Sequence, residues 1–287
     1  MAARGRRPPP RRRSARDLRG AAPRRRGGSE LGARVLVAVP AIAVALFIVA
    51  RGGWVFAGAL IILGIACMGE LFTMLRHGNP VRLAGFAGLA GMLVAAQLGG
   101  PDAVLAAFIF TLPLIFLLGQ MQPRCGAPGL SVTALGLMWI AVPLAHAVML
   151  RDLPHGDAIV IDVLVGTFIG DTGAYLGGRA FGRRPLAPMI SPNKTVEGLL
   201  IGMVAAVAGV WFAGLYQDWL SGPQALLLGI AVAVAAPLGD LFESYVKRDA
   251  RVKDSGALFG AHGGALDRLD AVLFSAVVGY YVWHAML

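Results

Sequence analysis

Long apolar segments separated by short polar stretches occupy the chain from Arg34 onward. Each segment approaches the length that a helix needs to cross the hydrocarbon core of a bilayer. Nine segments are predicted in this way, at residues 35–50, 53–75, 83–99, 102–119, 130–150, 158–178, 196–217, 224–243 and 268–287. The pattern predicts an all-α, polytopic integral membrane bundle of about nine transmembrane helices.

The composition agrees with this fold class. Hydrophobic residues make up 57% of the 287 residues, which excludes an ordinary soluble domain. The 39 glycines suit close packing of helices in lipid. Cys67 and Cys125 are isolated from each other in the sequence, so they predict neither a disulfide framework nor a zinc cluster.

The first 33 residues differ from the rest of the chain. They contain eleven arginines and almost no apolar residues, so they cannot bury enough surface to fold. We predict a disordered Arg/Pro-rich cytoplasmic tail at residues 1–33, followed by a transmembrane catalytic domain at residues 34–287. Anionic membrane lipids are its expected partner, and nucleic acid is not, because the tail lacks aromatic residues and adjoins a membrane span.

The positions of the basic residues predict the orientation. If the amino terminus is cytoplasmic, Arg51 and Arg151 are the only Lys or Arg residues in outer loops, which is a strong positive-inside bias. Trp54, Trp219 and Trp283 then fall near the outer interface, as in an aromatic belt. We therefore expect a multi-pass protein of a cell membrane, most simply a bacterial plasma membrane, with its polar inner loops facing the cytoplasm.

A charged stretch at residues 244–270 separates the last two apolar segments. It mixes basic residues, including Lys247, Arg248 and Lys253, with several carboxylates and a glycine-bracketed His262. Such a mixture is costly beside a bilayer unless its charges bind something. Basic side chains suit phosphate oxygens, and carboxylates suit a hard divalent cation. Together they favour phosphoryl or nucleotidyl transfer.

Several carboxylates are predicted to converge on this stretch. Four of the acidic residues within the apolar segments lie in the half nearest the cytoplasm: Glu70, Asp171, Asp240 and Glu243. Asp240, Ser244 and Lys247 recur at i, i+4 and i+7, so they share one helix face. Asp267 and Asp270 open the last segment and can approach a common cation from the other side. For Glu70 we prefer an ordinary helix end in the headgroup region.

A second polar stretch, residues 171–198, precedes the seventh segment. Glycines alternate there with Arg179, Arg183 and Arg184, and Ser191, Lys194 and Thr195 follow. A glycine-rich basic loop with hydroxyl groups is a plausible phosphate cradle, although it matches no P-loop pattern.

These two stretches resemble the phosphatidate cytidylyltransferases, also called CDP-diacylglycerol synthases. The first has the order Ser-x-Val-Lys-Arg from Ser244, Lys253-Asp254, and Phe-Gly-x-His-Gly-Gly-x-x-Asp-Arg-x-Asp from Phe259 to Asp270. The second has Asp-Thr-Gly-Ala-Tyr from Asp171 and Ser-Pro-x-Lys-Thr-x-Glu-Gly from Ser191. The similarity covers roughly the last 120 residues, and its one departure is Ala265, where the family usually carries a larger aliphatic residue.

The resemblance implies a reaction and a set of site residues. CTP and phosphatidate would give CDP-diacylglycerol and pyrophosphate for phospholipid biosynthesis. Asp240 and Asp267 would hold Mg²⁺, and the sequence does not determine whether one cation or two bind. The catalytic residues would be Asp240, Asp267, Lys247, Arg248, Lys253 and Asp270. Substrate or cofactor contacts are assigned to Asp171, Ser191, Lys194, Thr195, Ser244, His262, Gly263 and Gly264. For His262 a role in loop structure is an equally good explanation. Related enzymes also suggest a homodimer.

Two other functions compete with this one. A CTP-dependent polyprenol or phytol kinase would transfer the γ-phosphoryl group and release CDP. An ion-coupled transporter would also carry intramembrane acids, but near the bilayer midplane and with repeat symmetry between its halves, and no internal repeat is found. A CDP-alcohol phosphotransferase is disfavoured, because the spaced aspartates of that family are absent.

Overall fold

The computed structural model describes residues 40–256 and 263–287. The predicted tail at residues 1–33 and the predicted site residue His262 lie outside the described residues. The chain divides into two compact units, residues 1–45 and 46–287. In the first unit, residues 40–45 begin a short apolar helix, Pro40–Arg51. All predicted site residues that the structure describes belong to the second unit.

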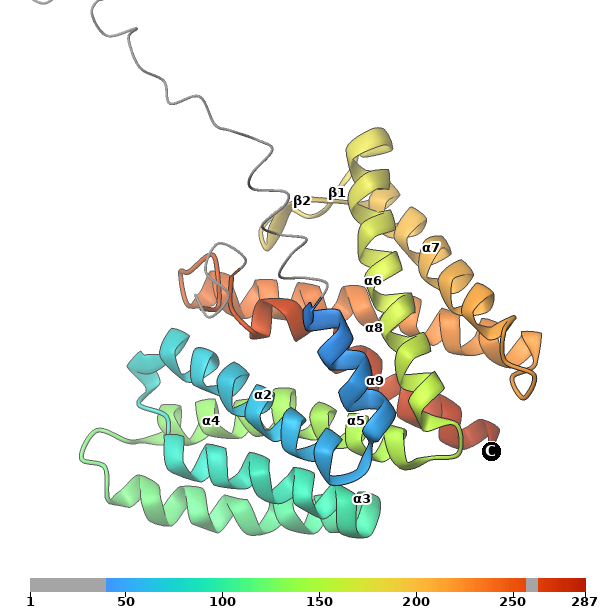
Figure 1. Ribbon diagram of the computed structural model, residues 1–287. Helices are drawn as coiled ribbons and strands as arrows, with labels where there is room; N and C mark the ends of the chain where they lie inside the picture. Colours follow the sequence, from blue (N-terminus) through green and yellow to red (C-terminus); the bar gives the residue numbers. More distant parts are fainter. Residues whose placement is uncertain (1–39, 257–262) are drawn as a thin grey trace, which may run out of the picture. The chain divides into compact units, whose positions relative to one another are not determined.

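Helices form almost all of the second unit (Figure 1). They are α2 (Gly53–Met74), α3 (Arg82–Gln120), α4 (Ala127–Gly136), α5 (Val142–Asp152), α6 (Gly156–Phe181), α7 (Val196–Gly214), α8 (Gly222–Asp249) and α9 (Leu266–Met286). A 3₁₀ turn, η2 (Arg76–Gly78), follows α2, and a π-helical turn, η3 (Leu137–Ala141), joins α4 to α5. Within the described residues, seven helices are long and apolar enough to cross a membrane, with α4, η3 and α5 counted as one. The predicted all-α membrane bundle is confirmed.

Two of the nine predicted segments lie within the single helix α3. The backbone leaves the helical region at Gly100 (φ 66°, ψ −154°), a conformation that favours glycine, and Pro101 follows. The legs on either side pack together, because a Cβ atom on Gly88 would lie 2.5 Å from Cγ2 of Thr111. Residues 83–99 and 102–119 are therefore two packed legs, as the apolar pattern predicts. The number of membrane crossings stays a prediction.

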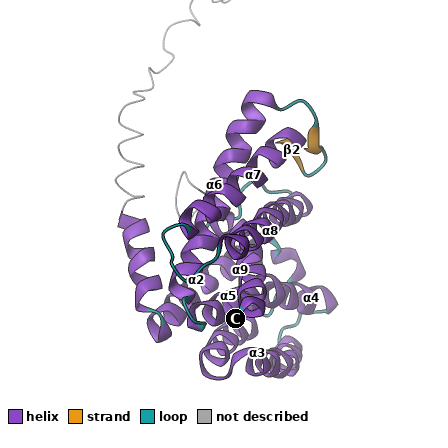
Figure 2. Cartoon of the chain, turned by 90° about the vertical axis from the view of Figure 1, so that its right-hand side faces the viewer, coloured by secondary structure: helices purple, strands orange, loops and turns teal. Residues whose placement is uncertain are grey.

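A small antiparallel hairpin departs from the all-α prediction. It joins β1 (Pro185–Ala187) to β2 (Ser191–Thr195) between α6 and α7 (Figures 1 and 2). Glu197, in the first turn of α7, accepts hydrogen bonds from the backbone N–H groups of Arg183 and Arg184 at 3.0 and 3.1 Å. These bonds fix the chain as it leaves α6. The predicted loop at residues 171–198 is therefore the end of α6 followed by this hairpin.

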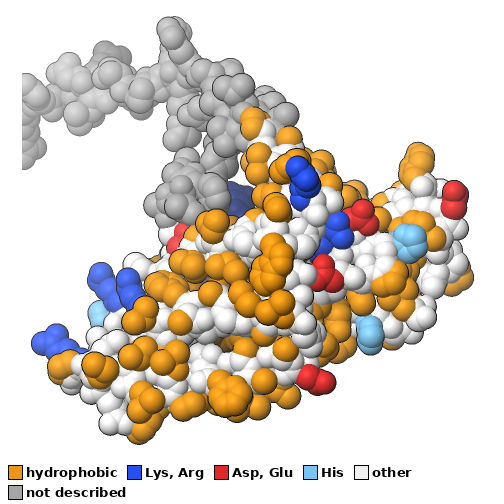
Figure 3. Space-filling model, turned by 60° about the horizontal axis from the view of Figure 1, so that its bottom comes forward, with side chains coloured by type: hydrophobic (Ala, Val, Ile, Leu, Met, Phe, Trp, Pro, Cys, Tyr) orange, Lys and Arg blue, Asp and Glu red, His pale blue; other side chains and the backbone are white. Residues whose placement is uncertain are grey.

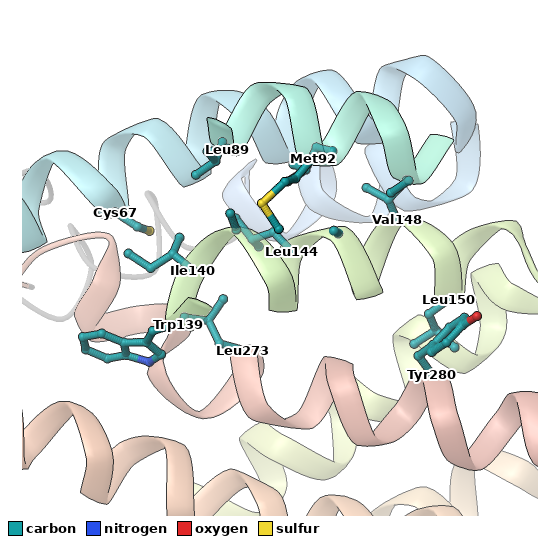
Figure 4. Close-up of a cluster of buried hydrophobic side chains, with 14 of the residues drawn as sticks. Cys67, Leu89, Met92, Trp139, Ile140, Leu144, Val148, Leu150, Leu273 and Tyr280 are labelled. Atoms are coloured by element: carbon teal, nitrogen blue, oxygen red, sulfur yellow. The ribbon is translucent and has the colours of Figure 1, made fainter. Parts of the chain in front are cut away.

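Buried apolar side chains from α2, α3, α5 and α9 form the core that Figure 4 shows in close-up. Cys67, Leu89 and Met92 are fully buried in it, and Leu144 and Leu273 are 3% and 1% exposed. Large apolar side chains also point outward, and Figure 3 shows hydrophobic side chains over much of one face. Because a lipid-facing surface is apolar, this distribution suits a bundle surrounded by membrane.

Aromatic side chains gather where α5, α7 and α9 reach the same end of the bundle. The rings of His155 and Trp219 stack at 4.1 Å, and Trp219 meets Trp283 edge to face at 5.5 Å. The indole N–H of Trp283 also donates to the carbonyl of Pro154 at 2.8 Å. The candidate site lies at the opposite ends of α6, α8 and α9. Which of these ends faces the cytoplasm stays a prediction.

Candidate active site

A cavity of about 580 Å³ lies where α6, α7, α8, α9 and the β1–β2 hairpin meet. Seven predicted site residues line it: Asp171, Ser191, Lys194, Thr195, Asp240, Asp267 and Asp270. They come from α6, β2, α8 and α9, and up to 99 residues of chain separate them, from Asp171 to Asp270. The cavity therefore brings together predicted carboxylates and groups predicted to bind phosphate, whereas Glu70 and Glu243 lie outside its lining.

Gly239 allows α8 and α9 to approach closely enough to share this cavity. A Cβ atom at position 239 would run into the carbonyl oxygen of Asp270, and it would lie 3.1 Å from the carbonyl carbon of Asp270 and 3.2 Å from Cα of Ala271. These are backbone atoms, which cannot rotate away. The absence of a side chain at position 239 thus brings Asp240 of α8 next to the first turns of α9.

Lys194 and Asp240 form an ion pair across the cavity wall. Lys194 belongs to β2 and Asp240 to α8, so the pair joins the hairpin to the helix. Their side chains are 29% and 31% exposed, respectively. Because the pair remains in contact with solvent, its net contribution to stability is small, and Lys194 is free to exchange a carboxylate for a phosphate oxygen.

Lys247 bridges two carboxylates behind the cavity wall. Its Nζ donates to Oδ1 of Asp267 at 2.8 Å and to Oε2 of Glu243 at 2.5 Å. Glu243 is 1% exposed, and its Oε1 has no hydrogen-bond partner within the described residues. The lysine expected to bind phosphate is therefore engaged with Asp267, a cavity residue, and with a buried glutamate.

Backbone N–H groups complete the surroundings of the Asp267 carboxylate. Ser255 N donates to its two oxygens at 3.0 and 3.2 Å, and Gly264 N donates to Oδ2 at 2.8 Å. Gly263 has φ 82°, and a Cβ atom there would lie only 2.7 Å from Oδ2. Gly263 and Gly264, both predicted to bind substrate, thus lie against Asp267, and the missing side chain of Gly263 leaves room for its carboxylate.

The other predicted site residues lie outside the cavity lining. Arg248 is exposed, and its Nε donates to the carbonyl of Ile190 in the hairpin at 2.9 Å. Lys253 is exposed after the end of α8, and Ser244 is half-buried on α8. Residues 244–249 belong to α8, so the predicted loop at residues 244–270 is shorter than expected.

Three polar residues of the cavity lining are absent from the predicted site residues: Tyr175, Arg179 and Asn193, although Arg179 belongs to the predicted phosphate cradle. Arg179 donates to the hydroxyl of Tyr175 at 3.3 Å. A signal for two of them was present, because Asp171, Tyr175 and Arg179 are spaced four residues apart and so share one face of a helix. The signal was not used, although Asp171 and Tyr175 lie within the predicted apolar segment at residues 158–178.

Glu70 also differs from its expected role as an ordinary helix end. It accepts hydrogen bonds from Ser255, Ala265 and Leu266, which surround the start of α9. No local pattern in the sequence connects Glu70 with these residues, because at least 185 positions separate them.

The carboxylates of the cavity suit a magnesium ion in their chemistry. Four line it: Asp171, Asp240, Asp267 and Asp270. In the described part of the chain, no group of three or more His, Cys, Asp or Glu side chains converges closely enough to hold a metal ion unaided. Magnesium in nucleotide enzymes usually takes one or two carboxylates, and substrate phosphates and water supply the remaining oxygens. The residues present therefore fit a site that substrate completes.

Comparison with known proteins identifies the family. Residues 32–286 match the model of the cytidylyltransferase family. A phosphatidate cytidylyltransferase of Synechocystis is 32% identical over 285 residues, covering 86% of this chain and 94% of that protein. One from Helicobacter pylori is 45% identical over 124 residues, covering 42% of this chain and 46% of its own length. The chain is also 36% identical over 186 residues to the uncharacterized protein YnbB of Escherichia coli, spanning 62% of it. The chain therefore belongs to the cytidylyltransferase family.

Proposed function

We propose that this membrane protein transfers the cytidylyl group of CTP to phosphatidate, giving CDP-diacylglycerol and pyrophosphate for phospholipid synthesis. One observation carries the proposal: the two stretches that resemble the phosphatidate cytidylyltransferases line a single cavity. The family match over residues 32–286 and the similarity to a Synechocystis phosphatidate cytidylyltransferase along most of its length support the same reaction.

The chemistry needs positioning more than a strong base. A phosphate oxygen of phosphatidate attacks the α-phosphorus of CTP, and the bond from that phosphorus to the bridging oxygen breaks, so pyrophosphate leaves. Phosphatidate is already ionised near neutral pH, and no proton has to be removed in the attack. The main barrier is the repulsion between two anionic substrates, which cations and oriented donors can offset.

We assign the phosphate contacts to the hairpin side of the cavity. Lys194 and Arg179 supply positive charge, and Ser191 and Thr195 supply hydroxyl groups. Binding of a phosphate by Lys194 would release Asp240 from its ion pair. Arg248 would act from further away, since it holds the hairpin through the carbonyl of Ile190.

We assign the cation to Asp240 and Asp267. A bound Mg²⁺ would neutralise phosphate charge and stabilise the leaving pyrophosphate. Lys247, bonded to Asp267, orients that carboxylate. Asp171 and Asp270 add negative charge to the same cavity and are candidates for a second cation.

We further propose that the cavity faces the cytoplasm at a bacterial plasma membrane. The basic residues Arg183, Arg184 and Lys253 belong to the site end of the bundle, whereas Arg151 belongs to the aromatic end. This distribution supports the positive-inside orientation. A homodimer stays a prediction, and cross-linking in intact membranes tests it.

Product analysis with labelled CTP tests the reaction. Purified protein is incubated with phosphatidate, Mg²⁺ and CTP labelled at either the α- or the γ-phosphorus, with the Asp240→Asn variant as control. We expect α-label in the lipid, γ-label in pyrophosphate, and neither product from the variant. A lipid kinase would instead place γ-label in the lipid. If wild-type protein forms no cytidine-bearing lipid, the proposal is wrong.

A further inference from the structure

Glu70 binds the start of α9 from a helix far away in the sequence. It lies near the end of α2, and its Oε1 accepts from the backbone N–H of Ala265 at 2.9 Å. Its Oε2 accepts from the N–H of Leu266 at 2.9 Å and from the hydroxyl of Ser255 at 3.1 Å. Glu70 itself lies outside the cavity lining. Its influence on the site must therefore act through these partners.

Helix α9 needs such a partner because its own N-cap residue cannot serve. The first N–H groups of a helix have no acceptor within the helix, and a side-chain oxygen usually supplies one. The N-cap position is occupied by Ala265, whose methyl group accepts nothing. The carboxylate of Glu70 takes this role from α2, and its negative charge also complements the positive end of the helix dipole.

Two glycines leave space for the carboxylate of Glu70. A Cβ atom on Gly256 would lie 2.6 Å from Cδ of Glu70, and a Cβ atom on Gly264 would lie at the same distance. Side chains at either position would therefore displace Glu70. The segments before and after residues 257–262 both close around this one carboxylate.

The groups that Glu70 binds adjoin those that hold Asp267, and Ser255 belongs to both sets. Ser255 uses its hydroxyl to bond Glu70 and to accept from the N–H of Asp267 at 3.3 Å. The backbone N–H groups of Ser255 and Gly264 donate to the Asp267 carboxylate. Displacement of Glu70 would therefore move both backbone donors to Asp267, while the third donor, Lys247, belongs to α8.

We propose that Glu70 is a positioning residue for the reaction: it fixes Ser255 and the first turn of α9, so that the Asp267 carboxylate faces the cavity ready to bind a divalent cation. The cation part of this statement rests on the proposed function. The structural part, the coupling of α2 to Asp267, does not depend on which reaction the cavity supports.

The test compares Glu70→Gln with the matched control Asp162→Asn. Asp162 lies on α6, is 1% exposed, and accepts from the amide of Gln217 at 3.0 Å, outside the cavity lining. Each substitution replaces a carboxylate by an amide of the same shape. The glutamine keeps one acceptor oxygen and turns an NH₂ group toward a backbone N–H, so one of the two helix-start N–H groups loses its partner.

Manganese binding with CTP present and amide hydrogen exchange provide the readouts. For Glu70→Gln we expect about tenfold weaker Mn²⁺ binding, equivalent to roughly 1.4 kcal/mol. We also expect faster exchange at Ala265 and Leu266. Asp162→Asn should leave Mn²⁺ binding and exchange at Ala265 and Leu266 unchanged. It should lower the thermal unfolding temperature about as much as Glu70→Gln does. Wild-type Mn²⁺ affinity and exchange in Glu70→Gln would overturn the proposal.

Ser255→Ala keeps the test decisive if Glu70→Gln does not fold. It removes the hydroxyl that bonds Glu70 and accepts from the Asp267 N–H, but it leaves the Ser255 N–H that binds the Asp267 carboxylate. A change in the same direction is therefore expected, and no change in either readout would contradict the coupling. The two proposals fail separately. Hydrogen exchange reports the Glu70 coupling even if the protein forms no CDP-lipid. If the protein is active with CTP but Glu70→Gln behaves as wild type, only the coupling is rejected.

Discussion

Replacing Gly239 by alanine tests whether the approach of α8 to α9 builds the site. The added methyl group meets the carbonyl of Asp270 and lies 3.2 Å from Cα of Ala271, and neither backbone group can rotate aside. The two helices would have to separate by about 1 Å, and a displacement of that size can lower a reaction rate about 100-fold. The expected cost in stability is about 1–3 kcal/mol, typical of an overpacked core.

The assay measures kcat, KM for CTP and thermal unfolding of purified Gly239→Ala protein. The control is Gly91→Ala on α3, where no atom lies within 4 Å of the added Cβ. We expect kcat to fall by about two orders of magnitude in Gly239→Ala and to stay unchanged in Gly91→Ala. If Gly239→Ala turns over at the wild-type rate, close contact between α8 and α9 is not needed to align the carboxylates.

Four further changes probe the charges of the site and the tail. Asp267→Asn should abolish turnover in a protein that still elutes as folded, and near-normal turnover would remove this residue from the cation site. Lys247→Met should lower the free energy of unfolding by about 3–5 kcal/mol, because it leaves Glu243, 1% exposed, without its partner. Lys194→Met should lower the free energy of unfolding by about 1 kcal/mol or less, because the ion pair of Lys194 is partly exposed, and it should raise KM for CTP. Denaturant unfolding and steady-state kinetics distinguish Lys247→Met from Lys194→Met. Deletion of residues 1–33 should leave turnover in detergent intact, and a loss would assign the tail a role in catalysis.

Local spacing was sufficient to predict which residues share one face of α8 and which share one face of α9. Asp240 and Lys247 share a face because they lie seven residues apart on a helix, and Asp267 and Asp270 share another at a spacing of three. Apolar segment length predicted the spans for a similar reason, since the thickness of a bilayer determines the length of a crossing helix. Both inferences need only the geometry of a single helix.

Contacts between distant elements could not be predicted in this way. Lys247 was expected to bind phosphate, yet it bridges Glu243 and Asp267, and Arg248 contacts the hairpin. The hairpin itself was expected to be a loop, because its strands are short and Pro185 and Pro192 weaken their strand pattern. Glu243 lies one turn from Lys247 on α8, but Asp267 and Ile190 lie on other elements, 20 and 58 residues away along the chain. Local spacing gives no sign of these two contacts.

The sequence alone predicts a polytopic helical membrane protein, because bilayer thickness and helix periodicity act on local composition. Its two polar stretches also resemble those of the phosphatidate cytidylyltransferases. The tertiary structure decided which polar groups meet. Close packing at Gly239 sets α8 against α9, and the carboxylate of Glu70 takes the place of a missing cap on α9 from 195 residues away. Such contacts arise only once the whole bundle has assembled, since each depends on two surfaces that no single segment contains.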